Sequence, residues 1–190
     1  MMELSPGLAQ TLATTSNAAV AANLSVGTNN FPVESQQMSN WCWAASASAL
    51  TNFYNQTTGP STQPQIVAQV LSMPVCAAGV PIPDCNQTAD FSNVLTTISH
   101  LQVPMVDDTL APEKLIDQLA NNNPVGCEMN IPGIGGHIVL VVAATTDAQG
   151  QVFVTVADSA DGTLPVMTFG QLSTDFRGHG GQWVRSYLTN

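Results

Sequence analysis

The hydrophobic pattern changes its period near the middle of the chain, and this change constrains the fold more than any other feature. From Trp41 to Tyr54, small and apolar residues recur at helical spacing. They predict a buried helix that starts beside Cys42 and ends near Gly59 and Pro60. Its many alanines allow neighbouring elements to approach closely. Three further helices are predicted at residues 65–72, 90–100 and 112–121.

The second half of the chain is instead rich in β-branched residues that alternate with period two. The sequence DAQGQ between the second and third of these runs is a hairpin signal. Helices followed by an antiparallel sheet predict an α+β domain whose two halves meet along a cleft. The predicted strands are residues 125–131, 137–145, 151–157, 164–169 and 182–188.

Composition excludes several classes of protein. Of the 190 residues, 44% are hydrophobic and only 8% are charged, which predicts one domain with a substantial core. Three Lys and Arg against thirteen Asp and Glu give a net charge of -10, so we expect no nucleic-acid binding. The apolar runs are far shorter than the roughly 18 residues of a membrane helix, so we expect no membrane span.

Residues 1–30 differ in composition from the rest of the chain. They are rich in Ala, Ser, Thr and Asn, and Glu3 is their only charged residue. We interpret this segment as a flexible N-terminal arm, leader or linker, with a short helix possible at residues 17–24. Residues 31–190 are assigned to the folded domain. No standard secretion signal is visible in the first segment.

Two of the four cysteines lie close together in a loop-like segment. Cys76 and Cys85 flank the sequence AAGVPIPD, which is short enough for a disulfide to close. A disulfide would imply an oxidising destination. The alternative is two ordinary buried thiols, and a zinc site would need more ligands. Cys127 is interpreted as a thiol in a core strand.

Cys42 stands where a helix favours a negatively charged group. The unsatisfied N–H groups and the dipole of a helix N-terminus stabilise a thiolate, so Cys42 is a candidate nucleophile. Gln36 precedes it by six residues, and its amide can donate to an oxyanion together with the Cys42 backbone N–H. Gln37 is a competing candidate for this role. Trp41 and Trp43 are interpreted as packing and cleft-wall residues.

A candidate base and its partner lie in the predicted sheet. His137 follows Gly135 and Gly136 at the start of the most apolar strand, where the glycines leave room for a substrate backbone. Asp158 ends the next strand and is placed to orient the imidazole, with Asp161 as the alternative. The other ionisable residues are given no catalytic role: His100 and His179 are expected at surface or capping positions, and Asp107 and Asp108 in a solvated turn.

Three blocks of the sequence resemble the glutamine, cysteine, histidine and aspartate blocks of papain-like cysteine peptidases. They are SQQMSNWCWAASASAL, GGHIVLVV and VADSADG, and the resemblance spans residues 31–190. The NWCWAA stretch most resembles compact bacterial effector proteases, and the layout is similar to that of bacteriocin leader-processing peptidases.

The chain also departs from papain. Ser39 stands where papain has a half-cystine, three residues before the nucleophile. His137 follows Cys42 by 95 residues, fewer than the roughly 130 to 150 of the papain and cathepsin branch. The third catalytic residue is Asp rather than Asn. These differences favour the compact bacterial branch.

Together the residues and the resemblance predict a cysteine endopeptidase in which Cys42, His137 and Asp158 form a triad and Gln36 contributes to the oxyanion hole. No metal or organic cofactor is expected. The resemblance implies a protein substrate, delivery into another cell as a bacterial effector or toxin, and an immunity or inhibitor protein if rival bacteria are the target. Residues 1–30 would then be a delivery linker or a self-cleaved leader. The alternatives are a deamidase or peptidoglycan amidase with the same triad, and a non-catalytic binding domain.

Overall fold

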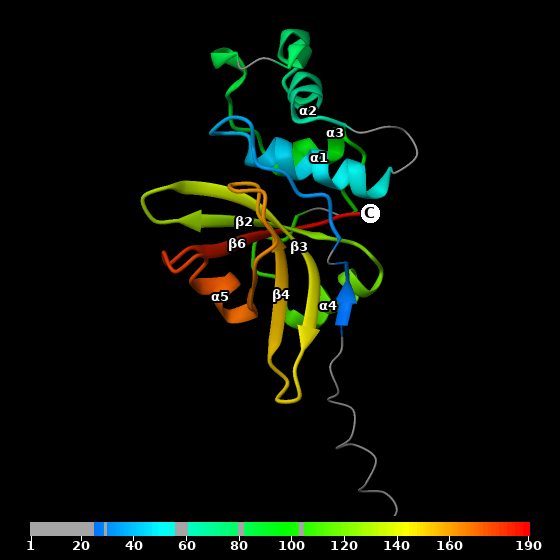
Figure 1. The fold of residues 1–190 in the computed structure, drawn as a ribbon, viewed down its shortest axis with the longest axis vertical. Coiled ribbons are helices and arrows are strands. Elements are labelled where there is room, and N and C mark those ends of the chain that lie inside the picture. Colours follow the sequence, from blue (N-terminus) through cyan, green and yellow to red (C-terminus); the bar gives the residue numbers. More distant parts are fainter. Residues whose placement is uncertain (1–24, 29, 56–60, 80–81, 103–104) are drawn as a thin grey trace, which may run out of the picture.

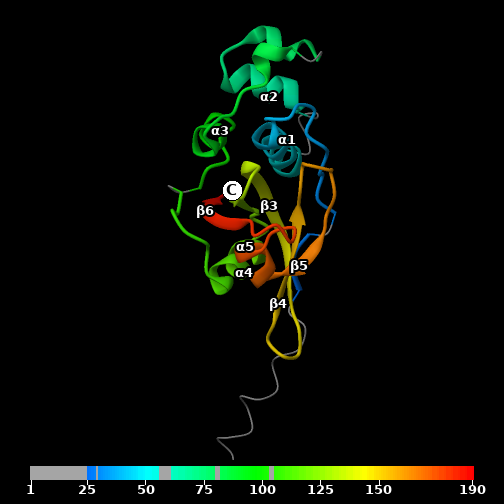
Figure 2. The same cartoon turned by 90° about the vertical axis from the view of Figure 1, so that its left-hand side faces the viewer.

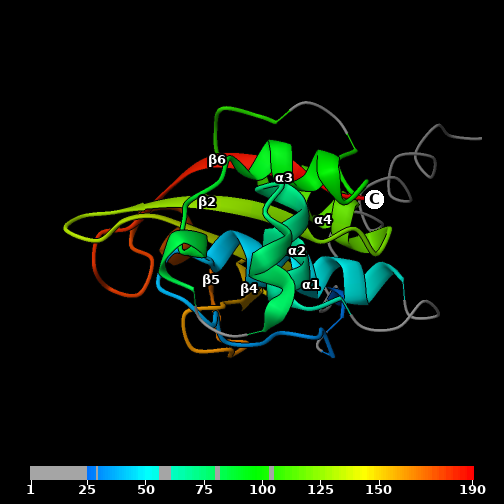
Figure 3. The same ribbon diagram turned by 90° about the horizontal axis from the view of Figure 1, so that it is seen from above.

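The computed structural model describes residues 25–28, 30–55, 61–79, 82–102 and 105–190, and it places a layer of helices against one face of an antiparallel sheet (Figure 1). The helical layer comes from the first half of the chain, and Figure 3 looks onto it from above. It contains α1 (Cys42–Tyr54), α2 (Gln63–Val70), α3 (Phe91–Thr97) and the 3-10 turns η1 (Pro74–Ala78) and η2 (Pro83–Cys85). The predicted α+β architecture is therefore confirmed.

The sheet of the described chain has six strands, all paired antiparallel. Five follow the order β5-β4-β3-β2-β6, and β1 pairs with β3 beyond Val141, where the pairing of β3 with the start of β2 stops. The strands are β1 (Ser25–Gly27), β2 (Val125–Ile131), β3 (Gly135–Thr146), β4 (Val152–Ala157), β5 (Val166–Thr168) and β6 (Gln182–Leu188).

Strand β3 separates two hydrophobic cores because its side chains alternate between the faces of the sheet. Ile138 and Leu140 pack with α1 on one face, whereas Val139 and Val141 face the other core. The second core is covered by α4 (Pro112–Ala120) and α5 (Phe169–Thr174), which lie beside the sheet in Figure 2. The sheet is thus buried on both faces, which explains the continuous apolar run of β3.

Helix α1 is the buried helix that the sequence predicts. Residues 43–50 are all buried, and their small side chains let α1 lie close to β3. The helix ends earlier than expected, at Tyr54, because Asn55 leaves the helical conformation while its N–H still bonds Thr51. Residues 56–60, where the end was predicted, lie outside the described residues.

Other boundaries differ where local capping decides them. Helix α2 begins two residues before its predicted start because Thr62 and Gln65 form a capping box. The sequence predicts a strand that ends at residue 169, but a second capping box between Thr168 and Gln171 starts α5 there. Strands β2 and β6 have their predicted ends, and the predicted hairpin joins β3 to β4.

Part of the predicted N-terminal arm belongs to the sheet. Ser25, Val26 and Gly27 form β1 and pair with residues 143–145 of β3. Backbone pairing to an already buried strand does not require an apolar pattern in the added strand, which explains why composition alone missed it. The helix suggested at residues 17–24 lies outside the described residues.

Candidate active site

Cys42 is the first residue of α1 and lies at the junction of the helical layer and the sheet. Its side chain is half-buried and lines a cleft of about 500 Å³ together with His137 and Gln36. Trp41, at the N-cap, provides no side-chain hydrogen bond to the first turn. The N–H groups of that turn are therefore not capped by a side chain, and they favour negative charge beside the Cys42 sulfur.

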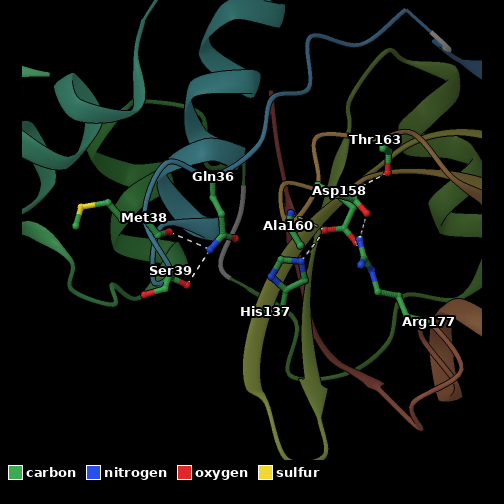
Figure 4. Close-up of polar contacts among 9 residues, drawn as sticks. Gln36, Met38, Ser39, His137, Asp158, Ala160, Thr163 and Arg177 are labelled. Atoms are coloured by element: carbon green, nitrogen blue, oxygen red, sulfur yellow. Dashed lines mark hydrogen bonds and ion pairs between the residues drawn. The ribbon is translucent and has the colours of Figure 1, made fainter. Parts of the chain in front are cut away.

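The β3–β4 hairpin brings His137 and Asp158 together. Leu140 pairs with Ala157, so His137 near the start of β3 lies close to the residue that follows β4. His137 Nε2 lies 2.8 Å from Oδ1 of Asp158, whose side chain is fully buried (Figure 4). His137 and Cys42 line the same cleft, and interactions with Cys42 contribute to the raised pKa of His137. Since Nε2 bonds Asp158, Nδ1 is the ring nitrogen left for Cys42.

The charges in this chain of three residues favour a protonated imidazole. Burial lowers the pKa of His137, but its hydrogen bonds and charge interactions with Asp158 and Cys42 outweigh burial and raise the pKa to about 9. Burial raises the pKa of Asp158, whereas His137, the Ala160 N–H and Arg177 lower it, with a net shift below the ordinary value. At neutral pH the geometry therefore favours an imidazolium between a carboxylate and the Cys42 sulfur.

Arg177 bonds the carboxylate oxygen of Asp158 that His137 does not contact. Its Nε donates to Oδ2 of Asp158 at 2.7 Å, and its Nη2 lies 2.8 Å from Oδ2 of Asp161. Asp161 is therefore linked to Asp158 through Arg177 and is not the histidine partner. Sequence analysis missed Arg177, although it is one of only three basic residues in the chain.

Gln36 lies across the cleft from His137 (Figure 4). Its Nε2 donates to the main-chain oxygens of Met38 at 3.0 Å and Ser39 at 2.8 Å. Both amide hydrogens are thus engaged in the loop before Cys42, and donation to an oxyanion requires one of them to be released. Gln37, the competing candidate, is exposed and does not line the cleft.

A buried side chain holds the main chain on both sides of Gln36. Gln63, at the start of α2, is fully buried. Its Nε2 donates to the oxygen of Ser35 at 2.8 Å, and its Oε1 accepts from the N–H of Gln37 at 2.9 Å. Sequence analysis missed Gln63 because the predicted helix starts two residues later. The only sequence signal for its role is an amide side chain at a helix start, beside a polar loop.

Of the two alternatives for Cys76 and Cys85, a disulfide or two buried thiols, the structure has the disulfide. The segment after Cys85 attaches to the loop that precedes Cys42. Asn86 accepts from the N–H and the side-chain amide of Asn40, both at 2.9 Å, and donates to Oγ of Ser39 at 2.9 Å. Residues 88–91 then form one wall of the cleft.

Both tryptophans beside Cys42 are buried and anchored to the same segment. Trp41 Nε1 donates to the oxygen of Cys85 at 2.8 Å, and Trp43 Nε1 donates to that of Gln87 at 3.0 Å. Trp43 also lines the cleft. Their predicted roles in packing and in the cleft wall therefore agree with the structure.

The cleft is also lined by two charged residues, Glu128 and Arg185. Arg185 Nη1 lies 3.0 Å from Oε2 of Glu128, and its Nε bonds Asp107 at 2.7 Å. Tyr187 donates to the same Glu128 oxygen at 2.6 Å. A substrate that fills the cleft would therefore meet an ion pair as well as apolar walls.

The remaining histidines and the second free thiol lie away from the cleft. Of the two positions predicted for His100, the surface position is wrong and the capping position is confirmed: it is only 7% exposed, stacks on Tyr54 and bonds the oxygen of Asn190 at 2.7 Å, while its main-chain N–H bonds the oxygen of Leu95 at the end of α3. His179 is exposed, as expected. Cys127 is fully buried in β2, and burial raises its pKa, which agrees with a core thiol.

The described residues contain neither a group of metal ligands nor a membrane-spanning helix. No group of three or more His, Cys, Asp or Glu there has a metal-binding arrangement. Within the same residues, no helix is long and apolar enough to cross a membrane.

Comparison with known proteins adds the family. The family model described as papain-like cysteine protease AvrRpt2 matches residues 25–172 of the chain. The matched segment includes β1 and contains Gln36, Cys42, His137 and Asp158, and it ends before Arg177. No curated protein matches the chain at a significant level.

Proposed function

Because the chain belongs to the AvrRpt2 family of papain-like cysteine proteases, a family of hydrolases, we propose that it is an endopeptidase in which Cys42, His137 and Asp158 form the catalytic triad. The observation that carries this proposal is the 2.8 Å bond between Asp158 and His137 in a cleft that His137 shares with Cys42, the first residue of α1. A nucleophile, a base and an orienting carboxylate in this order are the parts that thiol acyl transfer requires.

The proposed reaction has two stages. The Cys42 thiolate attacks the carbonyl carbon of a peptide bond, forming a C–S bond and a tetrahedral oxyanion. His137 then gives its proton to the leaving nitrogen as the C–N bond breaks, which leaves a thioester on Cys42. In the second stage His137 takes a proton from water, the hydroxide displaces the sulfur, and a new carboxyl group is released.

The oxyanion needs hydrogen-bond donors at the N-terminus of α1. The Cys42 N–H is one candidate, and Gln36 is the other because its amide lines the same cleft. In this proposal Gln36 gives up its bond to Met38 or Ser39 when the oxyanion forms. Loss of one such donor typically lowers kcat by about 100-fold to 1,000-fold.

We also propose that the protease acts outside the cell that makes it, as an effector or toxin, and meets an inhibitor protein where its target lies in rival bacteria. The Cys76–Cys85 disulfide supports this, since such bonds form in oxidising compartments. The formal net charge of -10 of the whole chain makes a protein substrate a better fit than nucleic acid. Detection of the protein in the culture medium of the producing cells would support this location; confinement to the cytoplasm would oppose it.

The experiment that tests the activity compares the wild type with Cys42→Ala and with Cys127→Ala as a matched control. Each protein is incubated with a bacterial and a eukaryotic proteome, and new N-termini are identified by mass spectrometry. The proposal predicts new N-termini with the wild type and with Cys127→Ala, and none with Cys42→Ala. Released muropeptides from purified peptidoglycan, or glutamine residues gaining about one dalton without chain cleavage, would favour the amidase or deamidase instead.

A further inference from the structure

Arg177 is the cation that lies against the Asp158 side of the proposed triad, and its contacts are directional. Both Nε and Nη2 lie within 2.7 Å of Oδ2 of Asp158, while Oδ1 receives His137 and the N–H of Ala160. The two carboxylate oxygens are thus shared between an arginine and a histidine. A fully buried carboxylate with this set of partners is fixed in one orientation.

The backbone conformation and packing of the loop that carries Arg177 direct its side chain toward Asp158. Arg177 has a φ of 59°, a conformation that residues with side chains adopt rarely, and it follows the fully buried Phe176. The Phe176 ring centroid lies 6.3 Å from that of His137, and the Phe176 N–H bonds the oxygen of Gly181. The same short loop therefore packs against the imidazole and bonds the carboxylate behind it.

The charge of Arg177 opposes the effect of Asp158 on His137. Asp158 alone would hold a proton on the imidazole tightly, which makes the imidazolium a poor acid for the leaving nitrogen. Arg177 offsets part of the negative charge of Asp158 and thereby lowers the proton affinity of His137. Asp161, which is half-exposed, in turn offsets part of the Arg177 charge.

We propose that Arg177 is a positioning residue of the triad, which fixes Asp158 for its bond with His137 and limits how tightly His137 holds its proton. This inference rests on the proposed function, since it concerns the same triad. The charged or titratable groups facing the His137–Asp158 pair are Cys42 from α1, Arg177 from the loop after α5, and Asp161 through Arg177. Three other charged residues line the same cleft: Glu128 and Arg185 bond each other, and Asp90 accepts from the N–H of Asn93 at the start of α3.

The test is an NMR titration of the His137 imidazole, which needs no substrate. It is carried out at low ionic strength in a Cys42→Ala background, where the thiolate cannot affect His137. Among the three histidines of the chain, the His137 signal is the one that is absent from the spectrum of His137→Gln. Arg177→Gln, Arg177→Lys and Asp161→Asn are compared with the parent. Lys114→Gln, on the exposed face of α4, is the control that changes the net charge as Arg177→Gln does.

The proposal predicts shifts of opposite sign from the two neighbours. Arg177→Gln raises the midpoint of the His137 titration by about one pH unit, because the uncompensated charge of Asp158 stabilises the protonated imidazole. Asp161→Asn lowers this midpoint by a few tenths of a pH unit, because the full charge of Arg177 then acts on Asp158. Arg177→Lys and Lys114→Gln leave it close to the parent.

A purely structural role for Arg177 would destabilise the loop without moving the titration. An unchanged His137 titration in Arg177→Gln, or an equal shift in Lys114→Gln, would overturn the proposal. Where Arg177→Gln does not fold, as judged by its thermal melting, a missing shift in Asp161→Asn overturns it instead. A protein that shows the predicted shifts but generates no new N-termini in any proteome refutes the proposed function and leaves this charge coupling standing.

Discussion

The main-chain N–H of Gln36 donates a 2.7 Å hydrogen bond to the main-chain oxygen of Ser159. Gln36 belongs to the loop before α1, and Ser159 follows Asp158, the aspartate that bonds His137. The bond therefore joins the proposed oxyanion loop to the proposed carboxylate loop behind the cleft. Together with the Asp158–His137 bond, it links both sides of the site to one segment after β4.

Gly162 is required at this junction. It has a φ of +70°, and a Cβ placed on it would lie 2.7 Å from the Ser35 nitrogen. We predict that Gly162→Ala lowers the free energy of unfolding more than Gly150→Ala does, and slows any Cys42-dependent cleavage. Gly150 is the matched control, because it has a φ of +80° but no neighbour within 4 Å. Both variants pay the left-handed backbone penalty of about 1–2 kcal/mol, and only Gly162→Ala adds the clash. Equal losses in urea denaturation would show that the contact with Ser35 is unimportant.

Gln63 offers a second test of how the Gln36 segment is held. Replacing Gln63 with Ala leaves the Ser35 oxygen and the Gln37 N–H without their buried partner, which should destabilise the fold by about 1–3 kcal/mol. We expect proteolytic activity to fall as well, since Gln36 lies between the two freed groups. Urea denaturation and cleavage assays measure both effects. Gln149→Ala, in an exposed turn, is the control and should change neither; a Gln63 variant that matches it would contradict the assigned role.

Sequence patterns predicted the layers of this fold because burial produces periodic patterns. The alanine-rich run from Trp43 to Leu50 and the apolar run of β3 are each buried on nearly every side, so they stand out from their surroundings. Strand β1 and the 3-10 turns lack such a signal. They depend on backbone pairing or on a single disulfide, and neither leaves a hydrophobic period in the sequence.

The residues of the candidate site also fall into those that sequence patterns predict and those that they do not. Cys42, His137 and Asp158 were predictable because each stands at the end of a strongly patterned helix or strand. Arg177 and Gln63 were not, because they act through neighbours that are distant in sequence, 19 residues from Asp158 and 28 from Ser35. Only the folded chain shows which loops these side chains meet.

The Cys76–Cys85 disulfide should stabilise the cleft wall as well as the fold. Its short loop predicts a loss of about 2–3 kcal/mol on reduction. The segment that follows it carries Asn86, which bonds the loop before Cys42, so reduction should also lower activity. Thermal melting and cleavage with and without a thiol reductant measure both, and a double Cys76→Ser, Cys85→Ser variant, unaffected by the reductant, is the control. Identical melting of the oxidised and reduced wild type would contradict this prediction.

The pKa shifts predict a pH window for the stability that the His137–Asp158 pair contributes. The pKa of His137 is raised from 6.5 to about 9, so its contribution is complete below pH 6.5 and is lost as the pH rises through about 9. The pKa of Asp158 is lowered, so its contribution is present above its ordinary value of 3.8 and is lost only in stronger acid. Urea denaturation of the wild type should therefore show stability falling between pH 6.5 and 9. In His137→Gln that fall should be much smaller; an equal fall would show that another group causes it.

The rate of iodoacetamide labelling shows whether His137 activates Cys42. Labelling is measured at about pH 6, where a free thiol is almost entirely protonated. Mass spectrometry follows each free cysteine in the wild type and in His137→Gln, and the buried Cys127 serves as the internal reference. We expect Cys42 to be labelled at least about 10-fold faster in the wild type than in His137→Gln, while Cys127 is unreactive in both. Equal labelling of Cys42 in the two proteins would contradict the claim that His137 activates it.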